Sequence, residues 1–119
     1  TYQTDDLLEP DVPHFDEDKL LEKIDHDTDL MKSLLEMAAE EYPKFLQQMK
    51  TACENKDACS VKSIAHTLKG SAYNLEMTVL GDIARKMEFH HEDPEVLLLL
   101  LESLENEWKN VQNILEQKQ

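Results

Sequence analysis

The stretch PEVLLLLLESLENEWKNVQNIL, residues 94–115, decides the fold. Its apolar residues recur in alternating steps of four and three, the pattern of a helix that buries one stripe against neighbouring helices. Pro94 favours the first turn of a helix, so we expect this helix to begin there. The buried stripe should comprise Leu97, Leu101, Leu104, Trp108, Val111 and Leu115.

The segments that precede this stretch show the same helical spacing, and none shows the alternation of a strand. Asp16 is the expected N-cap of the first helix, and either Asp27 or Thr28 that of the second. Pro43 lies inside the second helix, where it predicts a kink or a break into two helices. The expected helices cover about 17–25, 28–55, 57–74 and 77–91.

The sequence therefore predicts an all-α protein, an antiparallel four-helix bundle with N-terminal helical additions. We place an acidic N-terminal strap, interrupted by two prolines, at residues 1–14, and the helical bundle domain at residues 15–119. The leucine run 97–101 holds more apolar residues than one stripe needs. We expect the strap to cover the remainder; an exposed remainder would instead mark a contact in a homodimer or with another protein module.

The chain is strongly acidic, with 12 Lys and Arg against 26 Asp and Glu and a net charge of −14 over 119 residues. Nucleic acid and anionic lipid surfaces repel such a chain, so we expect neither as a partner. The longest apolar run has six residues, too short for membrane insertion. Residues 60–75 are the exception to the acidic character, with Lys62 and Lys69 and no acid.

Cys53 and Cys59 are the two cysteines of the chain, too few for the usual four-ligand metal site. Reduced thiols of this kind indicate a cytoplasmic protein. The chain begins at Thr1 and not at Met, so we expect a piece of a longer protein. We expect no metal at 90–93, because adjacent helical residues point about 100° apart.

His66 lies on the side of its helix opposite the apolar residues, at 100° per residue, together with Lys69, Gly70 and Tyr73. A glycine inside a helix costs about 1 kcal/mol relative to alanine, and core packing does not require one on the outer side. It is explained if a second protein must approach the imidazole closely. Lys69, three residues after His66, is in reach of an anionic group carried on the ring.

Glu88 is the expected partner of His66 from the next helix. If the two helices form a hairpin that turns near residues 75–76, residue 85 is level with His66 and Glu88 lies one turn beyond. Helical side chains lean toward their own N-terminus, so His66 and Glu88 lean toward each other. A carboxylate that accepts from Nδ1–H would leave Nε2 as the nucleophile.

These residues resemble a known family, the histidine-containing phosphotransfer (HPt) domains that carry phosphoryl groups in multistep phosphorelays. The resemblance covers about 15–117 and rests on the run AHTLKGSA at 65–72, then Asn74-Leu75, Leu80 and Met87-Glu88. It implies that His66 is the phosphoacceptor, that Lys69 assists at the phosphoryl group, that Gly70 gives clearance to a docking receiver domain, and that Glu88 orients the ring.

Two residues depart from the family pattern. Glu76 stands where the family usually has glycine, which affects the shape of the turn, and Tyr73 replaces a commonly small residue. Tyr73 and Lys62 are expected to contact the partner together with Gly70. The domain itself needs no cofactor, since the resemblance implies that Mg²⁺ is bound by the partner receiver domain.

The predicted function is that of a phosphorelay carrier, which accepts a phosphoryl group on His66 from an aspartyl phosphate of one response-regulator receiver domain and passes it to another. A sensor kinase module in the same chain is a second expected partner, in which case the domain would be the cytoplasmic end of a membrane-bound hybrid kinase. The alternatives are a dimerisation and phosphoacceptor module of a sensor kinase, a non-catalytic scaffold, and a hydrolase with a His66–Glu88 dyad. No acid follows His66 directly and no nucleotide-binding glycine motif is present, which disfavours the first alternative.

Overall fold

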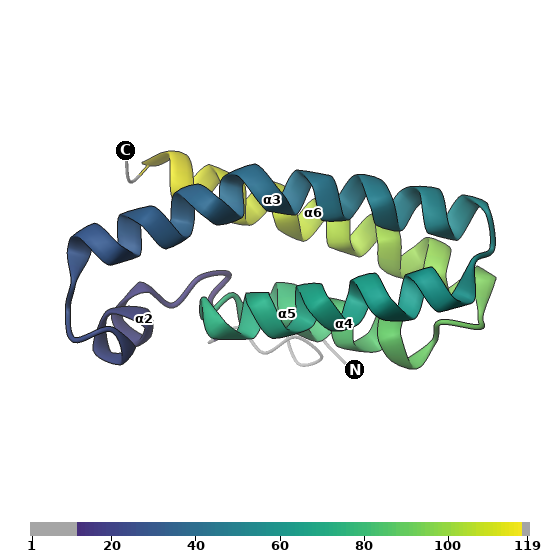
Figure 1. The fold of residues 1–119 in the computed structure, drawn as a ribbon, viewed down its shortest axis with the longest axis horizontal. Coiled ribbons are helices and arrows are strands. Elements are labelled where there is room, and N and C mark those ends of the chain that lie inside the picture. Colours follow the sequence, from purple (N-terminus) through teal and green to yellow (C-terminus); the bar gives the residue numbers. More distant parts are fainter. Residues whose placement is uncertain (1–11, 118–119) are drawn as a thin grey trace, which may run out of the picture.

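The computed structural model describes residues 12–117, which form five helices. A short helix, α2 (Glu17–Lys23), leads into α3 (Thr28–Glu54), α4 (Ala58–Asn74), α5 (Thr78–Phe89) and α6 (Pro94–Gln117). The last four run alternately up and down, and each packs against two of the others (Figure 1). The predicted all-α antiparallel four-helix bundle with an N-terminal helical addition is confirmed, whereas most of the expected strap lies outside the described residues.

Helix boundaries follow the capping residues. The carboxylates of Asp16, Asp27 and Asp57 accept from the backbone N–H groups three residues later, at 3.1, 2.9 and 3.2 Å. Each carboxylate thereby satisfies one of the amide groups that the first turn of a helix leaves without a partner. Asp27, and not Thr28, is therefore the N-cap of α3.

Helix α3 runs unbroken through Pro43, so the predicted alternative of two separate helices is wrong. Pro43 lies on the exposed side, where its missing N–H faces water. The apolar residues on both sides of it, Ala38 and Tyr42 before and Met49 and Ala52 after, pack into one core. Burial of both halves therefore outweighs the lost hydrogen bond.

The core contains the apolar stripe predicted for each helix. All six stripe residues of α6 are buried, as are Val61, Leu68, Ala72 and Leu75 of the segment around α4. The leucine run is not fully covered: the exposed fractions of Leu98 and Leu99 are 63% and 69%. These two residues point away from the stripe, and the strap that was expected to cover them lies mostly outside the described residues.

Within residues 12–117, four left-handed backbone positions end helices or form turns, and none of them is a glycine: Asp25, His26, Lys56 and Glu76 have φ between 54° and 60°. Left-handed backbone costs a side-chain-bearing residue roughly 1–2 kcal/mol. The two glycines, Gly70 and Gly81, lie inside α4 and α5 and have no positive φ. The backbone conformation therefore does not require glycine at either residue. The reason for each glycine must lie in the space that a side chain would occupy there.

Two buried carboxylates hold the N-terminal segment, residues 14–23, against the bundle. Glu76, 7% exposed, pairs with Lys23 at 2.8 Å and Lys19 at 3.5 Å. Glu107, 4% exposed, has its Oε2 2.7 Å from Nδ1 of His14. A buried carboxylate without a partner is strongly destabilising, so these pairs make the segment part of the domain.

We expect Glu76→Ala to lower the free energy of unfolding by about 2 kcal/mol, because a charged hydrogen bond is lost while the left-handed backbone remains. Glu76→Gly loses the same bond but removes the backbone strain, so it should be more stable than Glu76→Ala by about 1 kcal/mol. Urea denaturation of the two variants measures the difference. An alanine variant as stable as the glycine variant would contradict this account of the turn.

Candidate functional site

His66 lies on the outer side of α4, and 68% of its side chain is exposed. Its Nδ1 is 2.9 Å from Oε2 of Glu88, which reaches across from the last turn of α5. An ionised carboxylate only accepts hydrogen bonds, so Nδ1 must carry the proton. Nε2 then has a lone pair and no partner among residues 12–117, and it faces solvent.

Glu88 connects the two site residues of α4, His66 and Lys69. Its Oε1 accepts from the Lys69 ammonium at 2.7 Å, and its Oε2 accepts from His66, so the carboxylate bridges two residues of α4. The Lys69 hydrogen bond, opposed by partial burial and assisted by the His66 hydrogen bond, lowers the pKa of Glu88 below its ordinary value. Glu88 is therefore charged at neutral pH and holds the Nδ1–H tautomer of His66.

Lys69, which the sequence places within reach of an anionic group on the ring, donates to Glu88 in the structure, and 25% of its side chain is exposed. Its ammonium pairs with Oε1 of the carboxylate, whereas His66 contacts Oε2. The Lys69 contact helps to fix the direction from which Glu88 meets the ring.

Gly70 and Lys62 are both exposed on α4, one turn to either side of His66. A Cβ atom built on Gly70 would meet no atom of the described protein within 4 Å. Packing within the domain therefore does not require a glycine at residue 70. The backbone of α4 is left open beside the imidazole.

Tyr73 is half-buried and turns toward α5, in contrast to the exposed position predicted from the helical wheel. Its ring lies against Gly81, and its hydroxyl donates to Oδ1 of Asp82 at 2.6 Å. Burial, together with the hydrogen bond to Asp82, raises the pKa of the Tyr73 hydroxyl. Sequence reasoning missed Gly81 and Asp82, although a glycine opposite a tyrosine in an antiparallel hairpin was a usable signal.

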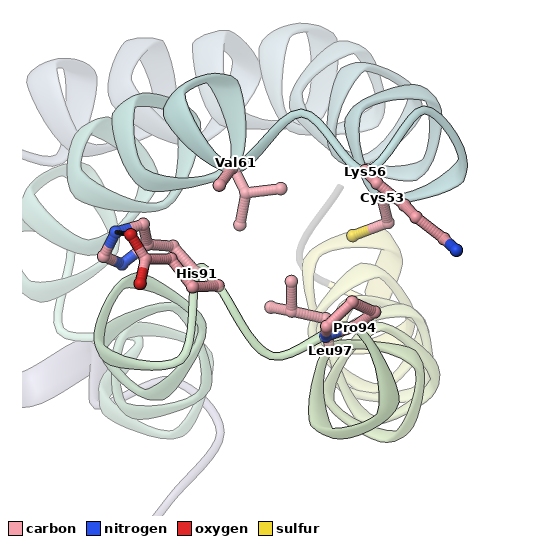
Figure 2. Close-up of a pocket in the computed structure, with 8 residues that line it drawn as sticks. Cys53, Lys56, Val61, His91, Pro94 and Leu97 are labelled. Carbon is pink, nitrogen blue, oxygen red and sulfur yellow. Dashed lines mark ion pairs between the residues drawn. The ribbon is translucent and has the colours of Figure 1, made fainter.

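A small pocket of about 140 Å³ lies at the end of the bundle where α3 turns into α4 and α5 turns into α6. Figure 2 shows the sulfur of Cys53 and the side chains of Val61 and Leu97 pointing toward this gap, while the ammonium of Lys56 points away. His91, at the rim, has its Nδ1 2.9 Å from the backbone oxygen of Glu88. Both cysteines are free, Cys53 half-buried and Cys59 exposed.

No helix between residues 12 and 117 combines the length and the apolar character needed to cross a bilayer. Within the same residues, His, Cys, Asp and Glu side chains form no group of three or more suited to a metal ion.

Comparison with known proteins agrees with this geometry. The model of the Hpt domain family matches residues 33–117, and the chain belongs to this family. The crystal structure of histidine-containing phosphotransfer protein B (HptB) from Pseudomonas aeruginosa PAO1 is similar, with a TM-score of 0.81 and 23% sequence identity over 89% of this chain and 94% of that chain. The sequence has no significant match among curated proteins.

The chain is therefore a histidine phosphotransfer domain, a carrier of phosphoryl groups in the phosphorelays of two-component signal transduction. Domains of this class exchange the phosphoryl group with receiver domains.

Because the pKa of Glu88 is lowered in the folded protein, its charge contributes stability above its ordinary pKa of 4.5, and this contribution disappears as the pH falls through the lowered value. Glu88→Gln should lower the free energy of unfolding at neutral pH by up to about 1 kcal/mol. In this variant the free energy of unfolding should also decrease less than in the wild type as the pH falls from neutral to about pH 3. Urea denaturation at both pH values tests this. Glu102→Gln, an exposed carboxylate on α6, is the control and should leave the pH dependence unchanged.

Proposed function

We propose that His66 is the phosphoacceptor of this domain, with Nε2 as the nucleophile. The observation that supports the proposal is the 2.9 Å contact between Nδ1 and Glu88, since it directs the lone pair of the exposed ring to the solvent-facing nitrogen. His66 is the one histidine of helices α4 and α5, and 68% of its side chain is exposed.

The transfer is a displacement at phosphorus. The lone pair of Nε2 attacks the phosphorus of an aspartyl phosphate on a receiver domain, the bond between phosphorus and the carboxylate oxygen breaks, and the carboxylate leaves as an anion. The proton on Nδ1 stays on the ring, which becomes cationic and is stabilised by the charged Glu88. The reverse displacement, by an aspartate of a second receiver, returns the ring to its neutral form.

Lys69 is proposed to assist once the phosphoryl group is on the ring. The new group adds negative charge one helical turn from the ammonium, which then has two anions within reach in place of Glu88 alone. Most of the charge stabilisation during transfer comes from the receiver, which we propose binds the Mg²⁺. The carrier contributes a positioned nucleophile.

The proposed docking surface is the exposed face of α4 around His66, with Lys62 and Gly70. Residues 60–75 contain no acid, and the carboxylate of Glu88, which contacts His66, is paired with the Lys69 ammonium. An acidic receiver pocket can therefore approach this face with little repulsion, although the whole chain has a net charge of −14. We further propose that a sensor kinase module supplies the relay and that the domain acts in the cytoplasm, where free thiols persist.

The acceptor is tested by incubation with a phosphorylated receiver domain. We expect the wild type, but not His66→Gln, to gain label that is labile in acid and stable in base, the signature of phosphohistidine. His91→Gln is the matched control, since this histidine lies in the turn after α5 and should not be required for labelling. Label that persists in His66→Gln would overturn the assignment, and binding of receivers without any transfer would indicate a scaffold.

Clearance at Gly70 gives a second prediction. Gly70→Gln should keep or raise the melting temperature, because glycine inside a helix costs about 1 kcal/mol, while transfer from the receiver should fall through steric blocking. Gly70→Ala should raise stability with a smaller effect on transfer. Ser103→Gln, which adds the same side chain to an exposed position of α6, is the control. Unchanged transfer in Gly70→Gln would show that the partner does not approach this part of α4.

A further inference from the structure

The contact between Tyr73 and Gly81 repeats the contact between His66 and Glu88 along the same pair of helices. Tyr73 follows His66 by seven residues on α4, and Gly81 precedes Glu88 by seven residues on α5. Seven residues are close to two helical turns, about 10 Å along the axis. Because α4 and α5 run antiparallel, the two contacts belong to the same alignment of the two helices and lie about two turns apart.

We propose that Tyr73 and Gly81 are positioning residues that set the register of α4 against α5 and thereby hold Glu88 within hydrogen-bonding distance of Nδ1 of His66. This inference rests on the proposed function only for its effect on transfer, since the geometry of the His66–Glu88 pair is independent of any partner.

The fit between the ring and the glycine is close. A Cβ atom on Gly81 would lie 2.6 Å from Cδ1 and 2.6 Å from Cε1 of Tyr73, distances that real Cβ contacts essentially never show. The ring thus occupies the space that any other residue at 81 would fill. At its tip, the hydroxyl donates to Asp82 at 2.6 Å, so the ring is held both at its face and at its end.

The His66–Glu88 contact tolerates little movement between the helices. A shift by one residue moves a helix about 1.5 Å along its axis, and hydrogen bonds of this kind weaken beyond about 3.2 Å. A 2.9 Å contact would not survive such a shift. Lys69 does not fix the register, because its long side chain can follow Glu88 over several ångströms.

A role of Tyr73 in docking, expected from the sequence, explains less. The ring is half-buried, its hydroxyl is bonded within the domain, and Gly81 has no positive φ that would require a glycine. A docking role gives no reason for the glycine opposite the ring. Space for the ring accounts for Gly81 directly.

The test uses Gly81→Ala in the whole chain, with the His66 ring followed by ¹⁵N NMR. We expect the fraction of the Nδ1–H tautomer to fall and the rate of transfer from a phosphorylated receiver to decrease on the order of tenfold. Tyr73→Phe keeps the ring in place and should preserve the tautomer. Val111→Ala, a core truncation on α6, is the control: it should lower the melting temperature without changing the tautomer.

A double-mutant comparison separates positioning from a general structural role. In a Glu88→Ala background, Gly81→Ala should cause no further loss of transfer, because the residue through which it acts is gone. An additive loss, or a His66 tautomer that is unchanged in Gly81→Ala, would overturn the inference. If His66 were not the phosphoacceptor, transfer would be indifferent to His66→Gln, whereas the tautomer measurement would still decide the positioning role.

Discussion

The site depends on one carboxylate that binds two residues of a neighbouring helix. Glu88 accepts from His66 at 2.9 Å and from Lys69 at 2.7 Å, and each of these contacts restricts a different oxygen. Removal of either contact would leave the carboxylate held through one oxygen alone. The chemistry of the exposed ring nitrogen is therefore controlled from the opposite side of the ring, by the packing of α4 against α5.

The large features of the fold could be predicted because they follow from local rules. Apolar spacing gave the helices, and aspartates at positions 16, 27 and 57 mark where three of them begin. Pro43 was harder, since its effect depends on whether the missing N–H faces water or the core, which a sequence pattern does not specify. Burial of Glu107 was also missed, because its partner, His14, is distant in sequence.

Side-chain directions within the site were predicted less well than its composition. Helical geometry brings His66 and Glu88 together, and the structure contains this contact. The position of Lys69 depends on competition between two anions, of which only Glu88 is part of the domain. Tyr73 was assigned to the outer face because a helical wheel ignores the neighbour: with glycine at 81, a gap exists on α5 and the ring fills it.

The pairs that anchor the N-terminal segment bear on where this domain begins. The Hpt family model starts at residue 33, yet His14, Lys19 and Lys23 supply the partners of the buried Glu107 and Glu76. A fragment cut at the family boundary would retain α4 and its exposed His66 but would remove the partners of both acids. The packed part of the chain therefore extends N-terminal to the matched stretch, and it is held there both by these carboxylate pairs and by the buried side chains of Phe15 and Leu20.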